Sequence, residues 1–182
     1  MRVPHLARLV LVALLASTIA SCAAAADTQT SVIILRHAEK DSATGLLTPE
    51  GGARAQELAE VLGDASVTAI FASDQQRTVD TVGPLAERLG LPVQRVPVTG
   101  DAGAYAAELA ALVRAQPPGG VVCVCNHSNI IPLLVRALGA PDVPALDEKR
   151  DFDQLFLVTL GDGPRASLVR ARYGAPRSAN VP

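Results

Sequence analysis

Two histidines and two arginines are the residues of this chain best suited to chemistry. His37 ends the segment Val-Ile-Ile-Leu-Arg-His, and His127 ends Val-Val-Cys-Val-Cys-Asn-His. Arg36 precedes the first histidine, and Arg77 follows a third apolar run. Imidazole is a nucleophile at neutral pH, and guanidinium is a planar fork that matches phosphate oxygens. If the three apolar runs are neighbouring strands, the four side chains form a site for an anion.

The elements that must position these residues alternate between strand and helix. Strands are predicted at residues 32–35, 67–71, 93–98 and 121–125. Thr48-Pro49 is typical of a helix start, and Ser73 or Asp74 is expected to cap a second helix. Amphipathic helices are predicted from these sets of apolar residues spaced by three and four: Ala55, Leu58, Ala59 and Leu62; Val79, Val82, Ala86 and Leu89; Tyr105, Leu109, Leu112 and Val113; Ile131, Leu134, Val135 and Leu138.

This alternation predicts an α/β fold with three layers. A mostly parallel sheet would be covered by helices on both faces, as an α/β/α sandwich. Residues 155–160 and 165–171 flank Gly161-Asp162-Gly163-Pro164 and predict a C-terminal antiparallel hairpin at the edge. In open parallel sheets, ligands bind beyond the carboxyl ends of the strands. Both histidines and both arginines are expected at that end.

Each of the four residues also has an ordinary interpretation. A histidine at a strand end is often only a polar residue at an edge. An arginine in the first turn of a helix is usually solvated, but there it opposes the helix dipole, and a bound anion relieves that mismatch. The convergence of all four residues on one edge favours an anion site.

The first 26 residues have the pattern of an export signal. A positive segment precedes a short apolar run at residues 9–19, which is too short to span a bilayer comfortably. The sequence offers two alternative processing sites. Ile19-Ala20-Ser21-Cys22 resembles a bacterial lipobox, in which the signal ends at residue 21 and Cys22 is lipidated. The Ala23 to Ala26 run instead offers ordinary cleavage.

A signal peptide is predicted at 1–26, ending at 21 if the lipobox is used, with a single domain at 27–182; both sites predict export. The protein would be periplasmic, or a lipoprotein anchored by Cys22 and facing outward. Loss of Arg2 and Arg8 leaves 14 basic and 18 acidic residues and a net charge of −4. That balance argues against nucleic acid as a partner, because nucleic acid needs a broad basic surface. Cys123 and Cys125 are interpreted as small buried residues, because neighbours on one strand face are poorly placed for a disulfide.

Four segments resemble the histidine phosphatase (phosphoglycerate mutase-like) superfamily, in that family's order across residues 31–172. They are Leu35-Arg36-His37-Ala38-Glu39-Lys40, Leu47-Thr48-Pro49-Glu50-Gly51, Ala72-Ser73-Asp74-Gln75-Gln76-Arg77-Thr78 and Asn126-His127-Ser128-Asn129. The Arg-His-Ala-Glu-Lys form resembles small exported members. Asn126 departs from the pattern, because glycine is usual there, and it is expected to crowd the backbone beside His127.

The resemblance implies a phosphatase that needs no metal or other cofactor and acts on a small phosphorylated substrate. His37 would attack phosphorus and carry the phosphoryl group. Arg36 and Arg77 would hold its oxygens, and His127 as a cation would stabilise the transition state. Thr78 and Ser128 are candidate hydroxyl donors to phosphate, with helix capping as the alternative for both.

The general acid that protonates the leaving oxygen is less defined. Asp101 is the candidate, because it lies between Arg77 and His127, although it precedes a helix and is also a cap candidate. Glu108 and Glu39 are the alternatives. An activated substrate, such as a phosphoramidate, would need no acid.

Other functions also stay open. A metal-dependent hydrolase would use His37, Glu39, His127 and a further carboxylate as ligands, although two arginines beside a cation argue against it. A non-catalytic lipoprotein that binds a phosphorylated ligand would not need the nucleophile. A mutase would need phosphorylated donors that an exported enzyme lacks.

Overall fold

The computed structural model describes residues 29–161 and 163–174 of the chain. They form a six-stranded sheet in the order β3-β2-β4-β1-β5-β6. The first four strands in this order are parallel, and β5 and β6 are antiparallel to their neighbours. The strands are β1 (Thr30–Arg36), β2 (Val67–Ser73), β3 (Val93–Val96), β4 (Val121–Asn126), β5 (Gln154–Leu160) and β6 (Ala166–Arg172).

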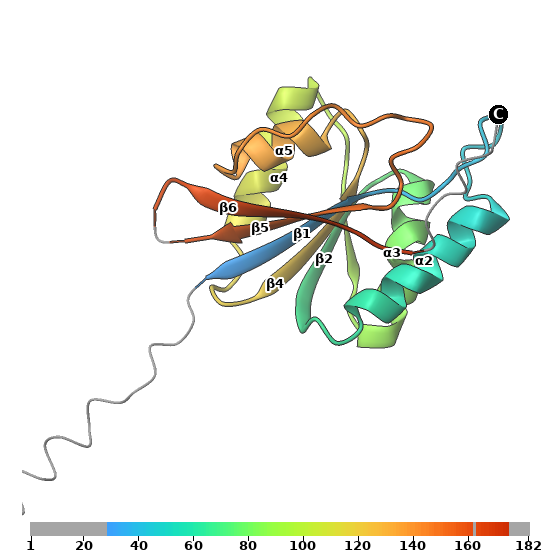
Figure 1. Ribbon diagram of the computed structural model, residues 1–182, viewed down its shortest axis with the longest axis horizontal. Helices are drawn as coiled ribbons and strands as arrows, with labels where there is room; N and C mark the ends of the chain where they lie inside the picture. Colours follow the sequence, from blue (N-terminus) through green and yellow to red (C-terminus); the bar gives the residue numbers. More distant parts are fainter. Residues whose placement is uncertain (1–28, 162, 175–182) are drawn as a thin grey trace, which may run out of the picture.

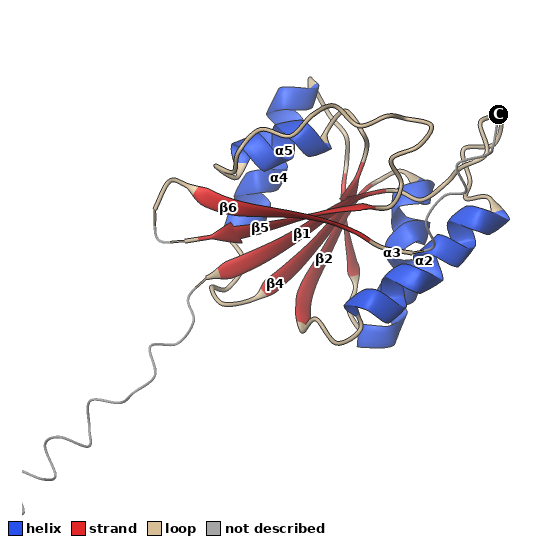
Figure 2. Cartoon of the chain, in the orientation of Figure 1, coloured by secondary structure: helices blue, strands red, loops and turns tan. Residues whose placement is uncertain are grey.

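Helices cover both faces of the sheet, which confirms the predicted three layers (Figure 1). The helices α2 (Pro49–Leu62) and α3 (Gln76–Leu89) pack on one face, and α4 (Ala102–Arg114) and α5 (Ile131–Ala137) pack on the other. Figure 2 shows the two helical layers in blue on either side of the red sheet.

Alternation along the strands divides the core between the two faces. Ile34 and Val124 pack with α4 and α5, whereas Leu35, Cys123 and Cys125 pack with α2 and α3. Both cysteines are fully buried and free, as expected. Burial raises the pKa of the Cys123 thiol to about 12, so this thiol stays protonated.

Most of the predicted helices are confirmed, with local corrections. Thr48 caps α2 by accepting a hydrogen bond from the Gly51 amide. The cap of α3 is Gln75, not Ser73 or Asp74, and its side chain makes no capping bond. Leu112 lies on an exposed face of α4, and β3 ends at Val96, two residues earlier than predicted.

The antiparallel hairpin brings a distant segment to the carboxyl end of β1. Leu155 pairs with Leu35, whereas Leu160 pairs with Thr30. The residues just before β5 therefore lie beside the carboxyl end of β1, where His37 follows Arg36. Figure 1 shows the connection between α5 and β5 reaching this end of the sheet.

The predicted signal peptide and Cys22 lie outside the described residues. Among the helices of the described segments, none is long and apolar enough to cross a membrane.

Candidate active site

His37 comes directly after β1, and its tautomer follows from its hydrogen bond. Its backbone amide donates to the carbonyl of Asn126 at 3.0 Å, which joins the ends of β1 and β4. Its ring nitrogen Nδ1 lies 2.8 Å from the carbonyl oxygen of Ala38. A carbonyl only accepts, so Nδ1 carries the hydrogen and the lone pair is on Nε2. This is the tautomer that a nucleophile requires.

The surroundings of His37 keep the ring uncharged. Only 4% of the residue is exposed. Burial lowers the pKa of His37 to about 3, against the opposing effect of the bond to Ala38. The positive charges of Arg36 and Arg77 lower the pKa of His37 further.

His127, directly after β4, lies with its ring edge-on to that of His37, with ring centroids 5.5 Å apart. Its Nε2 is 3.0 Å from the hydroxyl oxygen of Ser73, and its Nδ1 is buried without a hydrogen-bond partner among the described residues. Burial, followed by the charges of Arg77 and Arg36, lowers the pKa of His127 to about 4. The ring is therefore neutral at pH 7 on its own, and the expected cation would form only when an anion binds.

Ser73 is a site residue that the sequence prediction missed. The serine is fully buried at the end of β2, and its hydroxyl contacts both His127 and the hydroxyl of Thr78 at 2.8 Å. Its position at a strand end was visible in the sequence, but it was interpreted as a helix cap. Thr78, expected to donate to phosphate, is fully buried and donates to the carbonyls of Ser73 and Gln75.

Arg36 is held by the segment that precedes β5. Its Nη1 donates to the carbonyl of Asp147 at 3.1 Å and its Nη2 to that of Glu148 at 2.8 Å. Its guanidinium carbon lies 4.0 Å from the centroid of the Phe152 ring, and the same ring lies 6.2 Å from that of His37. The plane of the guanidinium is therefore fixed beside His37.

Arg77 is the second residue of α3 and is partly exposed. Its Nη1 lies 3.4 Å from the side-chain oxygen of Gln75, and its Nε is buried without a hydrogen-bond partner among the described residues. Its charge lowers the pKa of both histidines. A bound anion would satisfy the buried donor and offset these positive charges.

Asn126 orders the backbone beside His127 instead of crowding it. Its side-chain oxygen accepts from the His127 amide at 3.0 Å, and its side-chain nitrogen donates to the hydroxyl of Tyr105 at 3.1 Å. That hydroxyl donates to the carbonyl of Val96. The residue that departs from the family pattern therefore links the ends of β3 and β4 through α4.

The acid candidates lie in different places. Asp101 is exposed and caps α4, because one carboxylate oxygen accepts from the amides of Gly103 and Ala104. Glu108 is exposed on the same helix.

Ser128, the candidate hydroxyl donor to phosphate, caps no helix and donates to a carboxylate oxygen of Glu148 at 3.0 Å.

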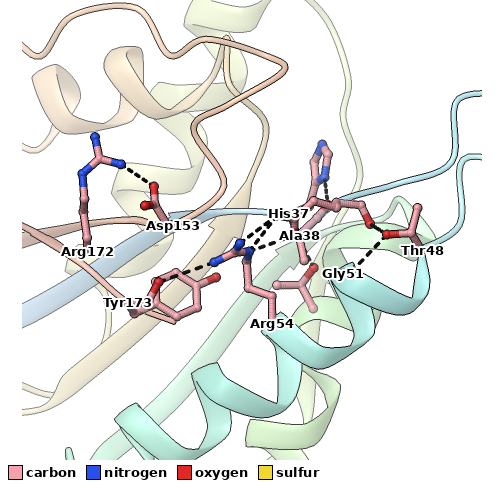
Figure 3. Close-up of polar contacts among 10 residues, drawn as sticks. His37, Ala38, Thr48, Gly51, Arg54, Asp153, Arg172 and Tyr173 are labelled. Atoms are coloured by element: carbon pink, nitrogen blue, oxygen red, sulfur yellow. Dashed lines mark hydrogen bonds and ion pairs between the residues drawn. The ribbon is translucent and has the colours of Figure 1, made fainter. Parts of the chain in front are cut away.

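Glu39 is buried and uses both carboxylate oxygens on Arg54 of α2, at 2.8 to 3.0 Å. Arg54 also donates to the carbonyl of Tyr173, beyond β6, so it lies between the His37 loop and the C-terminal segment (Figure 3). Glu39 is therefore a structural ion-pair partner two residues from His37. Across residues 29–161 and 163–174, no group of three or more His, Cys, Asp or Glu side chains is arranged to hold a metal ion.

An Arg-His pair ends one strand, a second histidine follows the next strand and a second arginine opens a helix. This arrangement is suited to binding a phosphate-like anion. The sequence model of the histidine phosphatase superfamily (branch 1) matches residues 32–98. Over these residues the chain is similar to that superfamily.

Two uncharacterized proteins of Mycobacterium tuberculosis, from strains H37Rv and CDC 1551, are each 33% identical to this chain over 78 residues. These matches cover 38% of this chain and 39% of each relative. The chain therefore matches well under half the length of these curated relatives.

Solved structures with the same fold cover more of the chain. Mycobacterial hydrolase 1 has a TM-score of 0.63 at 22% identity, over 78% of this chain and 97% of its own. The protein histidine phosphatase SixA, complexed with tungstate, has a TM-score of 0.61 at 22% identity, over 78% and 96%. A mycobacterial glucosyl-3-phosphoglycerate phosphatase has a TM-score of 0.60 at 18% identity, over 81% and 99%. At these identities the likeness shows the fold.

Proposed function

We propose that this protein is a phosphatase that hydrolyses a small phosphomonoester, or a phosphoramidate, through a covalent phosphohistidine on His37. The observation that carries the proposal is the geometry of His37. Its Nδ1 hydrogen is bound by the Ala38 carbonyl, which leaves a lone pair on Nε2, and the ring is kept neutral beside two arginines and His127.

In the first step, the Nε2 lone pair of His37 forms a bond to phosphorus. The bond from phosphorus to the leaving oxygen breaks, and its electron pair stays on that oxygen. Arg36 and Arg77 offset the charge on the phosphoryl oxygens. His127 becomes protonated as the phosphate binds, with Ser73 accepting from one ring nitrogen and phosphate accepting from the other.

In the second step, water attacks phosphorus and the N–P bond breaks. The electron pair of that bond returns to Nε2 of His37, so phosphate is released and the nucleophile is restored. The phosphoramidate is labile because imidazole is a good leaving group, which makes the histidine route suitable for turnover.

The names of two structural relatives support a phosphatase but differ in substrate. One is a protein histidine phosphatase and the other a glucosyl-3-phosphoglycerate phosphatase. The metal-dependent alternative is disfavoured by Glu39, because its carboxylate is committed to Arg54. A binding-only function does not account for a histidine held in the nucleophilic tautomer.

The test is to trap the intermediate. Wild type incubated with ³²P-labelled substrate and quenched in base should yield a phosphoenzyme that is stable in base and labile in acid. His37→Ala should abolish both labelling and turnover while keeping the circular dichroism spectrum and Tm of wild type. Vanadate should inhibit competitively, and EDTA should have no effect. An acid-stable phosphoenzyme, or turnover by His37→Ala, would contradict the mechanism.

A further inference from the structure

The turn that holds Arg36 also presents one carboxylate to the second histidine motif. Within residues 147–153, Asp147 accepts from the Lys149 amide and Asp151 from the Asp147 amide. Asp153 is paired with Arg172. Glu148 differs from these three, because its side chain leaves the turn and its Oε1 accepts from Ser128, the residue directly after His127.

Two contacts tie Glu148 to the two histidine motifs. Its carbonyl accepts from Arg36, directly before the nucleophile, and its carboxylate accepts from Ser128. The turn itself is closed by backbone bonds from the Arg150 and Asp151 amides to the Asp147 carbonyl. Glu148 is thus an exposed carboxylate on an ordered turn, anchored to both histidine motifs.

Two of the other acid candidates are committed elsewhere, whereas a third, Asp74, lies close enough to act on His127. Asp101 caps α4 and Glu39 is buried against Arg54. Asp74 is exposed, and its charge opposes the lowering of the His127 pKa, so it is the nearest competitor. Its side chain accepts from Gln75 at 3.3 Å.

We propose that Glu148 is the general acid of this site, and that the site therefore takes phosphomonoesters of ordinary alcohols as well as activated phosphoryl compounds. The inference rests on the proposed phosphatase function. In this role Glu148 carries a proton when the substrate is bound. Ser128 then still donates to Oε1, and the proton on Oε2 is free for the leaving oxygen.

Glu148 gives up one proton and regains one proton in each turnover. As the P–O bond breaks, the leaving oxygen takes its electron pair and the proton of Glu148, which becomes a carboxylate. When water attacks the phosphohistidine, the carboxylate takes a proton from that water. Glu148 is restored as an acid and phosphate is released.

The experiment compares leaving groups in wild type and Glu148→Gln of the full chain. Glutamine keeps an oxygen for Ser128 but has no acidic proton. We expect kcat/KM for an alkyl phosphate to fall by about 100-fold or more. For p-nitrophenyl phosphate it should change by less than about threefold, because nitrophenolate departs without a proton. Ser128→Ala should show the same selectivity to a smaller degree.

Controls separate this inference from the function it rests on. Glu87→Gln, at the far end of α3, should match wild type on both substrates. The assignment of Glu148 would be overturned if Glu148→Gln lost activity equally on both substrates, or lost none on either. It would also be overturned if Asp74→Asn or Asp101→Asn showed the selective loss instead. Failure of wild type to form a phosphoenzyme or to hydrolyse either substrate would instead overturn the phosphatase function.

Discussion

At the residue scale, the site is built around two neutral imidazoles next to two fixed positive charges. Burial disfavours the charged form of each ring, and the arginines act in the same direction. This arrangement serves the two histidines differently. It keeps the lone pair of His37 available, whereas it holds His127 ready to take a proton when a dianion enters.

The lowered pKa values predict how the two rings titrate. An ordinary histidine, with a pKa near 6.5, is mostly protonated at pH 5. His37 and His127, with pKa values of about 3 and about 4, should both stay neutral at pH 5. In ¹⁵N-histidine spectra, neither ring should titrate between pH 8 and pH 5. Adding vanadate at pH 7 should shift only His127 toward the protonated form.

The same shifts have a consequence for stability. Below pH 6.5 the unfolded chain binds protons at these positions more readily than the folded chain does, so the free energy of unfolding should decrease as the pH falls from 6.5 toward 4. A midpoint near 6.5 for His37 would contradict both the burial of the ring and its role as a neutral nucleophile at mildly acid pH.

Residue types and spacing were enough to predict Arg36, His37, Arg77 and His127 as neighbours, because parallel strands must place their carboxyl ends together. Glu148 and Ser73 were not predicted as site residues. The backbone carbonyl of Glu148 accepts from Arg36, which lies 112 residues away in the chain. Such a long-range contact leaves no periodic signal in the sequence. Ser73 looked like a cap because the helix start was placed two residues early.

At the element scale, α2 fixes the loop that carries the nucleophile. The loop folds back so that the carbonyl of Glu39 accepts from the Thr48 amide. Arg54 binds the carboxylate of the same residue, with side-chain exposures of only 5% and 6% for the pair. The helix therefore holds Glu39 by its backbone and its side chain, and so restrains His37 two residues earlier.

Adjacent glycines in α2 test this restraint. A Cβ at Gly51 would lie 2.1 Å from the carbonyl oxygen of Glu39, whereas a Cβ at Gly52 would meet nothing within 4 Å. Gly51→Ala should displace the loop, lowering the free energy of unfolding by about 1–3 kcal/mol and lowering kcat. Gly52→Ala is the matched control. It should stabilise the helix by up to about 1 kcal/mol with unchanged kcat.

Urea denaturation and steady-state kinetics on the two variants measure both effects. Equal behaviour of Gly51→Ala and Gly52→Ala would show that the helix does not restrain the loop. The sequence predicted this helix from its Thr-Pro start and apolar spacing. It could not predict the contact of Gly51, because a missing side chain gives no pattern of its own.

At the scale of the whole molecule, the site and the start of the domain lie at opposite ends of the sheet. The chain enters β1 at Thr30, and the site lies beyond Arg36 at the other end of that strand (Figure 1). Attachment through residues before Thr30 would therefore join the domain at the end of the sheet away from the site. This geometry is compatible with the proposed anchoring at Cys22 and with a small, freely diffusing substrate.

The last prediction tests that anchoring. If Ile19-Ala20-Ser21-Cys22 is a lipobox, labelled palmitate supplied to expressing bacteria should appear on the protein, and the protein should fractionate with membranes. Cys22→Ser removes the thiol that takes the lipid, so label and membrane association should both disappear. Ser21→Ala, which keeps a small residue before the cysteine, should behave as wild type.

An unlabelled wild-type protein that is cleaved and released in the periplasm would instead establish the Ala23 to Ala26 run as the processing site. An uncleaved protein in the cytoplasm would contradict export by either route.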